Sequence, residues 1–329
     1  MTNSIGVIGA GAWGTALAQV QAAAGRNVTL WAREAAVVNA VNNMGENTPF
    51  LPGVELHKNI HATSDLSEAI RPDVLLLVVP AQYMRAMVRE AGVKNLAGKT
   101  LVLCAKGIEI ETGELLSQIL RETVHDAHIA VLTGPTFARE IAMGLPAAVT
   151  VAADDIAHAR DLSVLLGSKT FRPYASDDVI GAEIGGAIKN VLAIACGIIA
   201  GRKYGDSARA ALLARGMSEM TRMALALGGK RETLMGMCGL GDLVLTATSM
   251  QSRNFSLGFA LGEGRSLAEI MESRTAVTEG VHTARAVRNL IKTLDIDLPI
   301  MTGVHAILHE GASVETVIDN LLSRPFNDE

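Results

Sequence analysis

Short apolar runs recur through the first half of the chain, separated by segments whose apolar residues have helical spacing. The runs are almost continuously hydrophobic, which is typical of parallel strands buried on both faces. We predict strands at residues 4–8, 27–31, 74–79, 100–105, 129–132 and 148–152. Residues 15–24 and 113–123 are predicted to be helical. This alternation indicates an α/β fold with a doubly wound parallel sheet and right-handed crossovers.

The pattern changes after about residue 177, where strand-like runs nearly disappear. Helices are predicted at residues 181–200, 209–227, 256–262, 267–273, 281–294, 300–310 and 314–322. We therefore expect two domains, residues 1–178 with the sheet and residues 179–329 as an all-helical C-terminal domain. Because no flexible linker separates them, firm packing of the two domains is also expected.

A glycine-rich turn follows the first predicted strand. Residues 9–14 read GAGAWG, a G-x-G-x-x-G pattern that leads into the helix predicted at 15–24. In a Rossmann-type sheet, Gly9 would allow the tight turn, Gly11 the approach of a pyrophosphate, and Gly14 close helix–strand contact. The helix N-terminus would add free N–H groups and a positive dipole end. The pattern predicts a dinucleotide-binding domain, and a glycine-rich turn without a ligand is the less favoured alternative.

The residues after the second predicted strand bear on the type of cofactor. NAD sites usually carry Asp or Glu here for the ribose 2′-hydroxyl, whereas this chain has Arg33 followed by Glu34. Arg33 is suited to pair with the 2′-phosphate of NADPH. Glu34 leaves the type of cofactor open, because a role in capping the next helix explains it at least as well as a contact to the ribose. We expect NADPH or NADH, with NADPH favoured.

A lysine lies beside two glycines on the first predicted helix of the C-terminal domain. One face of this helix carries an apolar stripe formed by Ile184, Ile188, Val191, Ala195 and Ile198. Lys189 is roughly 140° around the helix from Ile184, outside that stripe. Its side chain leans toward the turn that holds Gly185 and Gly186, where a substrate or another backbone can approach. The pattern alone equally allows glycines that serve helix packing beside a solvated lysine.

Further polar residues follow glycine-rich turns or predicted strands. Asp242 follows the sequence GLG, and Ser252, Arg253 and Asn254 place a hydroxyl, a guanidinium and an amide on consecutive residues. Such donors suit an anionic group, although N-capping by Asp242 and a polar loop are the simpler alternatives. Lys106 follows a predicted strand, at the edge where open α/β sheets bind ligands; its alternative is a solvated charge.

Composition and charge narrow the class of protein. The 329 residues include 29 basic and 34 acidic side chains, giving a net charge of −5, and no run of five basic residues occurs. This gives no support to a nucleic-acid or anionic-membrane partner. Three cysteines without metal or disulfide spacing fit a reduced compartment. We read no signal peptide, and the apolar stretch at 191–201 is short of the roughly 20 residues of a membrane span. We expect a cytoplasmic, soluble protein without a metal.

Glycine is abundant, with 32 residues. We expect nine of them to remove a side chain where a ligand approaches. These nine are Gly9, Gly11, Gly14, Gly107, Gly134, Gly185, Gly186, Gly239 and Gly241.

Together these segments closely resemble the bacterial NAD(P)-dependent glycerol-3-phosphate dehydrogenases. The resemblance runs from residue 6 to about residue 289 and includes FLPG at 50–53, GAIKNVLA at 186–193, RG at 215–216 and GLGDL at 239–243. It implies reversible NAD(P)H-dependent reduction of dihydroxyacetone phosphate to sn-glycerol 3-phosphate, the backbone of phospholipids. It also implies a homodimer.

The resemblance also implies roles for particular residues. Lys189 would be the catalytic acid/base, with Asp242 and Lys106 as further catalytic residues. The implied substrate contacts are Lys106, Gly134, Thr136, Lys189, Asn190, Asp242, Thr246, Ser252, Arg253 and Asn254. The implied cofactor contacts are Gly9, Gly11, Ala12, Trp13, Gly14, Arg33, Lys106, Ala138, Arg253, Val277 and Glu279.

Two positions depart from the family pattern. Phe255 stands where the family often has a basic residue, and the loss of that positive charge is expected to weaken the cationic environment of the site. Ala247 stands where a cysteine is common.

Two other functions remain as alternatives. A related β-hydroxyacid or sugar-acid dehydrogenase would share the two-domain plan and the helical lysine, but residues 239–243 and 252–254 argue against it. A dinucleotide-sensing module without chemistry would explain residues 9–14 and leave Lys189, Asp242 and Arg253 without a role.

Overall fold

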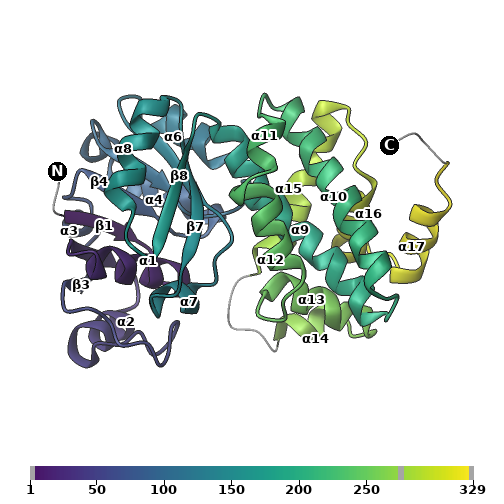
Figure 1. The fold of residues 1–329 in the computed structure, drawn as a ribbon, viewed down its shortest axis with the longest axis horizontal. Helices are drawn as coiled ribbons and strands as arrows, with labels where there is room; N and C mark the ends of the chain where they lie inside the picture. The colour runs from purple at the N-terminus through teal and green to yellow at the C-terminus, as the bar shows by residue number, and fades with distance from the viewer. Residues whose placement is uncertain (1–3, 273–277, 326–329) are drawn as a thin grey trace. The chain divides into compact units, whose positions relative to one another are not determined.

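The computed structural model describes residues 4–272 and 278–325 and divides the chain into two compact units. Unit 1 comprises Met1–Lys106 and Leu115–Glu183, and unit 2 comprises Gly107–Glu114 and Ile184–Glu329. We expected a boundary after residue 178. The two units instead divide after Glu183, inside the long helix α9 (Val179–Gly201). The elements are labelled in Figure 1.

Unit 1 contains an eight-stranded sheet in the order β3-β2-β1-β4-β5-β6-β7-β8. The six predicted strands are all present, within two residues of the expected ends. They are β1 (Ser4–Ile8), β2 (Asn27–Trp31), β4 (Val74–Leu77), β5 (Thr100–Leu103), β6 (His128–Thr133) and β7 (Ala147–Ala153). The α/β fold class is confirmed, but the prediction of an all-parallel sheet is wrong at one place, because β6 and β7 pair antiparallel.

Two strands were not predicted, β3 (Ile60–Thr63) and β8 (Phe171–Ser176). They are the two edge strands of the sheet. Edge strands are covered less completely, so polar residues interrupt their apolar pattern; β8 even contains Pro173, which an edge strand tolerates. Neither strand therefore has the continuous apolar run that identified the inner strands.

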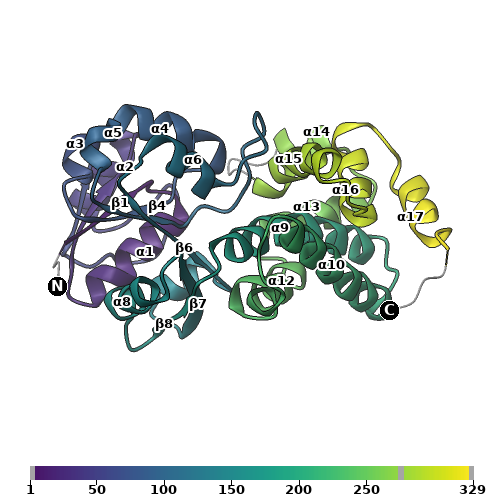
Figure 2. The ribbon, with the colours of Figure 1, turned by 90° about the horizontal axis from the view of Figure 1, so that it is seen from above.

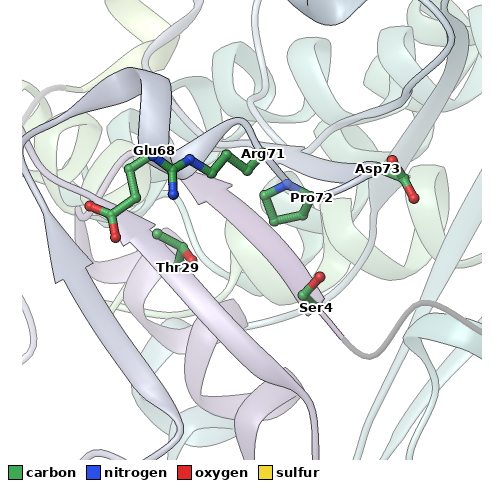
Figure 3. Close-up of a pocket in the computed structure, with 6 residues that line it drawn as sticks. All are labelled: Ser4, Thr29, Glu68, Arg71, Pro72 and Asp73. Carbon is green, nitrogen blue, oxygen red and sulfur yellow. The ribbon is translucent and has the colours of Figure 1, made fainter.

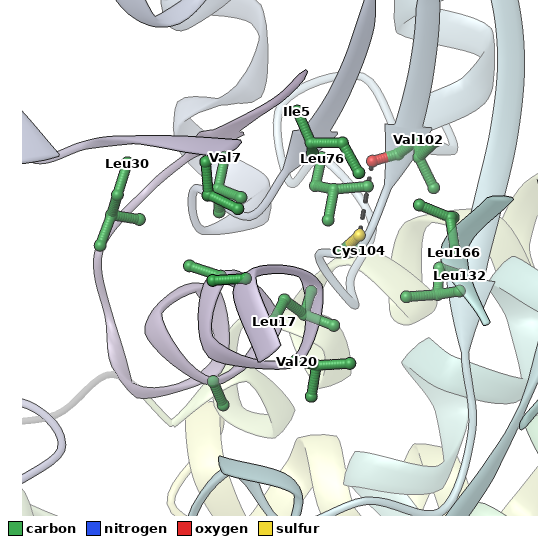
Figure 4. Close-up of a cluster of buried hydrophobic side chains, with 14 of the residues drawn as sticks. Ile5, Val7, Leu17, Val20, Leu30, Leu76, Val102, Cys104, Leu132 and Leu166 are labelled. Carbon is green, nitrogen blue, oxygen red and sulfur yellow. Dashed lines mark hydrogen bonds between the residues drawn. The ribbon is translucent and has the colours of Figure 1, made fainter. Parts of the chain in front are cut away.

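Helices cover both faces of the sheet. Figure 2 shows α4 (Met84–Ala91) and α6 (Leu116–Thr123) on one face, and α1 (Ala12–Ala23) and α8 (Ile156–Leu166) on the other. The remaining short helices of unit 1 are α2 (Ala35–Asn39), η1 (Ala40–Met44), α3 (Leu66–Ala69), η2 (Ala81–Tyr83), α5 (Val93–Leu96) and α7 (Ala138–Ala142). In Figure 4, Leu17 of α1 packs beneath strand residues such as Val7 and Leu76, all fully buried. This packing fixes the start of α1 at the end of β1.

Unit 2 is helical, and residues 184–272 and 278–325 contain no strand. After α9, its helices are α10 (Asp206–Ala226), α11 (Arg231–Leu234), η3 (Met237–Gly241), α12 (Asp242–Ala247), α13 (Arg253–Gly262), α14 (Leu267–Glu272), α15 (Glu279–Leu294), α16 (Pro299–His309) and α17 (Val314–Leu322). The predicted helices of this unit are confirmed, except that residue 273, the expected end of the helix at 267–273, lies outside the described residues. Helix α13 begins three residues earlier than expected because the Ser252 hydroxyl accepts a hydrogen bond from the Phe255 N–H and caps it.

Helix α9 has 23 residues and is longer than the apolar stretch expected at 191–201. By length and composition it is able to cross a membrane, but 89% of its most apolar window is buried within the protein. That degree of burial is typical of the core helix of a soluble protein.

Helices α9 and α13 cross at a contact made by glycines from both. A Cβ on Gly197 would lie 2.7 Å from the Phe259 nitrogen, and a Cβ on Gly258 would lie 2.9 Å from Ile194 Cα and overlap the Ile194 carbonyl oxygen. Backbone atoms are the obstacle in both cases. The two helix axes therefore approach as closely as they do only because these side chains are absent.

We expect Gly258→Ala to destabilise unit 2 by about 3 kcal/mol, because one helix must shift to admit the methyl group. Gly303→Ala is the matched control, since its Cβ would meet only the end of the Val317 side chain. Val317 is β-branched and must shift, but no backbone atom stands in the way and alanine is the better helix former by about 1 kcal/mol, so the loss of stability should be smaller than for Gly258→Ala. Urea unfolding of both variants tests the contrast, and equal stability would contradict the packing argument.

Candidate active site

The turn between β1 and α1 has glycine at three positions for three physical reasons. Gly9 has a φ of +119°, a conformation that side chains rarely adopt. A Cβ on Gly14 would overlap the Gly9 carbonyl oxygen, so the turn and helix could not pack as they do. A Cβ on Gly11 would meet nothing within 4 Å. Gly11 is therefore the glycine of this turn that leaves room for a ligand.

The start of α1 suits a phosphate group. Gly11 is the N-cap residue, and α1 has no side-chain cap. The helix has 12 residues, so its first N–H groups and its dipole present a positive end to an anion. Ala12 and Trp13 are its first residues, and the Trp13 indole donates to the Cys104 carbonyl oxygen at 3.1 Å. The open space at Gly11 and the uncapped helix fit the pyrophosphate of a dinucleotide.

Arg33 and Glu34 pair with each other directly after β2. The distance from Arg33 Nη2 to Glu34 Oε1 is 3.3 Å, and the two side chains are 77% and 50% exposed. Glu34 occupies the N-cap position of α2 but makes no side-chain cap bond. The capping interpretation of Glu34 is therefore not supported. Arg33 presents an exposed cation at the end of β2.

Three residues predicted to contact substrate meet near the end of β6. Lys106 Nζ and the Thr136 hydroxyl both donate to the Gly134 carbonyl oxygen, each at 3.3 Å. A Cβ on Gly134 would lie 2.8 Å from Val149 Cα on β7, so this glycine serves strand packing. Ala138 begins α7, a few residues further on.

In unit 2, Lys189 belongs to a buried polar cluster. Its Nζ donates to Asp242 Oδ1 at 2.9 Å and to Thr246 Oγ1 at 2.7 Å. The Thr246 hydroxyl also donates to Asp242 Oδ1 at 3.2 Å, one helical turn along α12. Lys189, Asp242 and Thr246 are 7%, 1% and 4% exposed. The alternative of a solvated lysine is therefore wrong, and an ammonium buried with one carboxylate is unusual enough to indicate a functional site.

Glycines bring the two halves of this cluster together. A Cβ on Gly185 of α9 would lie 2.6 Å from the Cys238 carbonyl oxygen, and one on Gly239 would lie 2.6 Å from Leu234 Cα. Both glycines let η3 lie close to its neighbours, and η3 leads directly into Asp242. The expectation that each site glycine makes room for a ligand is wrong for Gly14, Gly134, Gly185 and Gly239, because backbone atoms occupy that space. For Gly14, the close helix–strand contact that the turn pattern also predicted is confirmed.

Two predicted substrate ligands make hydrogen bonds inside unit 2. Asn254 Nδ2 donates to Asn190 Oδ1 at 2.9 Å, and Asn254 Oδ1 accepts from the Gly280 N–H at 3.0 Å. Together with the Ser252 cap, these contacts join the starts of α13 and α15. A direct role of these side chains toward substrate stays a prediction.

The same contacts place Arg253 and Glu279 at the first positions of α13 and α15. Desolvation lowers the pKa of Arg253, and the negative charge of Glu279 opposes that shift. The two side chains are therefore close enough to interact electrostatically. Val277, the remaining predicted cofactor contact, lies outside the described residues.

The two departures from the family pattern are core positions. Phe255 is 4% exposed and Ala247 is fully buried. The Phe255 side chain therefore packs in unit 2 instead of projecting into solvent.

A shallow pocket elsewhere in unit 1 has none of these residues. Its volume is about 320 Å³ and its lining, drawn in Figure 3, is Ser4, Thr29, Glu68, Arg71, Pro72 and Asp73. Ser4 begins β1 and Asp73 precedes β4, so the pocket lies at the amino ends of the strands. The glycine turn follows the opposite end of β1. Within residues 4–272 and 278–325, no group of three or more His, Cys, Asp or Glu side chains is arranged to hold a metal.

Comparison with protein families gives two matches that together span most of the chain. Residues 4–159 match the model of the NAD-dependent glycerol-3-phosphate dehydrogenase N-terminus. Residues 178–319 match the model of the C-terminus of the same family.

Individual relatives agree with these matches. The chain is 55% identical to a glycerol-3-phosphate dehydrogenase [NAD(P)+] of Parvibaculum lavamentivorans, over 99% of this chain and 98% of the relative. It is 54% identical to the enzyme of the same name from Rhodospirillum rubrum, over 99% of this chain and 94% of the relative. A crystal structure of glycerol-3-phosphate dehydrogenase from Coxiella burnetii is 38% identical, with a TM-score of 0.93 over 98% of this chain and 99% of that one.

Proposed function

The chain belongs to the NAD-dependent glycerol-3-phosphate dehydrogenase family, and from that premise we propose that it reversibly reduces dihydroxyacetone phosphate to sn-glycerol 3-phosphate with NAD(P)H. The observation that carries the proposal is the buried cluster of Lys189, Asp242 and Thr246. A protein that only senses a dinucleotide has no need of a buried ammonium and carboxylate. The relatives carry the same activity in their names.

The cofactor would bind at the turn of residues 9–14, where Gly11 leaves open space and α1 presents its N-terminus. A bound nicotinamide would supply the hydride that the ketone carbon receives. The chain's own contribution here is to hold the pyrophosphate with backbone N–H groups, and so to set the position of the rest of the cofactor.

Lys189 would supply the proton. When the ketone carbon gains a hydride, its oxygen develops negative charge, which the Lys189 ammonium stabilises before it delivers a proton from Nζ. Asp242 and Thr246 hold that nitrogen through two hydrogen bonds, which fixes its position within the buried site. Because Thr246 and Asp242 also bond to each other, all three side chains of the cluster are hydrogen-bonded to one another without substrate, which would favour a preorganised site.

The phosphate of the substrate would be bound by cations rather than by the charge of the whole protein, which is negative. Arg253 at the start of α13 offers a guanidinium beside a helix N-terminus, a combination that suits a phosphate. Lys106 is the further candidate, held at the end of β6 by the Gly134 carbonyl. Binding this remote group would align the carbonyl for reaction.

NADPH is the proposed preferred cofactor, and Arg33 supports that preference. We expect Arg33→Ala to weaken NADPH binding about tenfold or more, because a charged hydrogen bond to the 2′-phosphate is lost. NADH binding should change little. The dissociation constants of both cofactors test this, and equal weakening would contradict a role at the 2′-phosphate.

The proposal extends to the cellular location, the product and the oligomeric state of the enzyme. The three cysteines, all within the described residues, are buried and form no disulfide, which fits the cytoplasm, and the product would feed glycerophospholipid synthesis. We propose a homodimer on the resemblance alone, and sedimentation measurements would test it.

A direct assay tests the central claim. Oxidation of each reduced nicotinamide is followed at 340 nm with dihydroxyacetone phosphate as substrate, with dihydroxyacetone and a β-keto acid as controls. Turnover that requires the phosphate is the expected result. Turnover of the β-keto acid alone, or binding of cofactor without turnover of any substrate, would overturn the proposal.

A further inference from the structure

A buried asparagine lies against the glycine turn and was not singled out by its sequence. Asn47 is fully buried in the segment that follows η1. Its Nδ2 donates to the Ala10 carbonyl oxygen at 2.9 Å and to the Thr15 hydroxyl at 2.7 Å. The Thr15 hydroxyl donates to the same Ala10 carbonyl at 3.3 Å. One carbonyl of the phosphate-binding turn therefore receives two side-chain hydrogen bonds from within unit 1.

The geometry of the peptide bond extends this effect to the next residue. The Ala10 carbonyl and the Gly11 N–H belong to one planar trans peptide unit, in which they point in opposite directions. When Asn47 and Thr15 draw the carbonyl inward, the Gly11 N–H must point outward. Gly11 is exposed, and a Cβ built on it would meet nothing within 4 Å, so there is open space beside its backbone. An N–H turned away from the buried Asn47 side chain, at an exposed residue, is accessible to a ligand.

The segment that carries Asn47 is itself fixed. Asn47 Oδ1 accepts from the Phe50 N–H at 3.3 Å, and the Asn47 carbonyl accepts from the Leu51 N–H at 2.8 Å. The Pro52 carbonyl then accepts from Arg139 Nη1 of α7 at 2.6 Å. The motif FLPG at 50–53, which contributes no residue to the predicted site, thereby holds Asn47 in place.

We infer that Asn47 is a positioning residue for cofactor binding, which orients the Gly11 N–H toward a pyrophosphate oxygen of the dinucleotide. It acts through the Ala10–Gly11 peptide and does not touch the cofactor. The identity of the ligand rests on the proposed function, whereas the orientation of the peptide rests on the hydrogen bonds alone.

Two substitutions test the inference through direct binding. Asn47→Asp keeps the shape but replaces the donating amide, and Asn47→Ala removes both bonds. NADPH fluorescence titration without substrate should show a dissociation constant raised about 10- to 100-fold in both variants. A rise for Asn47→Asp alone that disappears at high salt would instead indicate charge repulsion and overturn the inference.

Asn42→Asp is the matched control. Asn42 lies five residues earlier and, although it is more exposed than Asn47, also makes two amide hydrogen bonds away from the turn: its Nδ2 donates to the Ala62 carbonyl at 2.8 Å and its Oδ1 accepts from the Ala62 N–H at 2.9 Å. Loss of the Asn42 amide should lower the unfolding temperature of the cofactor-free protein without changing the NADPH dissociation constant by more than about twofold. In steady-state kinetics, the Asn47 variants should raise KM for NADPH more than they lower kcat.

The outcomes separate the two claims. Wild-type binding of neither NADPH nor NADH would refute the proposed function. Normal wild-type binding with unchanged binding by both Asn47 variants would overturn only the inference. If neither Asn47 variant folds, the isosteric Thr15→Val, which removes one of the two donors to Ala10, should raise the dissociation constant severalfold, and an unchanged value would overturn the inference.

Discussion

Replacing Lys189 by methionine is expected to lower kcat by roughly 10²- to 10⁴-fold, the usual range for loss of a positioned general acid. Methionine fills similar space but offers neither a proton nor a positive charge to the oxygen of the reacting ketone. NADPH binding should persist, because the turn of residues 9–14 belongs to the other unit. Rapid-quench or steady-state turnover at saturating substrate measures the effect, and near-normal turnover would refute the assignment of Lys189.

Stability must be separated from catalysis in this experiment. Without Lys189, the Asp242 carboxylate, which is 1% exposed, would lose the ammonium that lies 2.9 Å away, and removal of one partner of such a buried pair costs about 3–5 kcal/mol. The double variant Lys189→Met with Asp242→Asn removes both charges together. It should recover much of the lost stability and remain inactive. Recovered activity in the double variant would show that the single variant failed by unfolding.

The sequence predicted the inner strands and long helices well because burial on both faces leaves a simple apolar pattern. It could not predict β3 and β8, whose edge positions mix polar with apolar residues. The antiparallel β6–β7 pair was also missed, because strand direction depends on the path of the connecting residues and leaves no mark in the strand itself.

The sequence indicated which residues belong to the candidate site more readily than which side chains they contact. Lys189 and Asp242 are 53 residues apart, and no local pattern states that they share a hydrogen bond. Asn254 was expected to bind an anion, yet its amide bonds to Asn190 and Gly280, since a polar side chain can serve a ligand or the fold. Asn47 gave no signal, because one asparagine in a connecting segment looks like any turn residue.

Gly11→Ala is expected to separate ligand binding from folding most cleanly. The backbone of Gly11 has φ −67° and ψ 179°, an extended conformation open to any residue, and the new methyl group meets no protein atom within 4 Å. Stability without cofactor should therefore change by less than about 0.5 kcal/mol. NADPH affinity should fall about 10- to 100-fold, because the methyl group takes the space through which a pyrophosphate approaches the backbone.

Gly14→Ala should give the opposite result, and the pair is therefore more informative than either variant alone. Its Cβ would overlap the Gly9 carbonyl oxygen, so α1 or the turn must move, and the cofactor-free protein should lose about 1–3 kcal/mol of stability. Thermal unfolding without cofactor and NADPH titration distinguish the two glycines. Loss of stability in Gly11→Ala, or unchanged affinity in that variant, would show that the open space at Gly11 is not where the dinucleotide approaches.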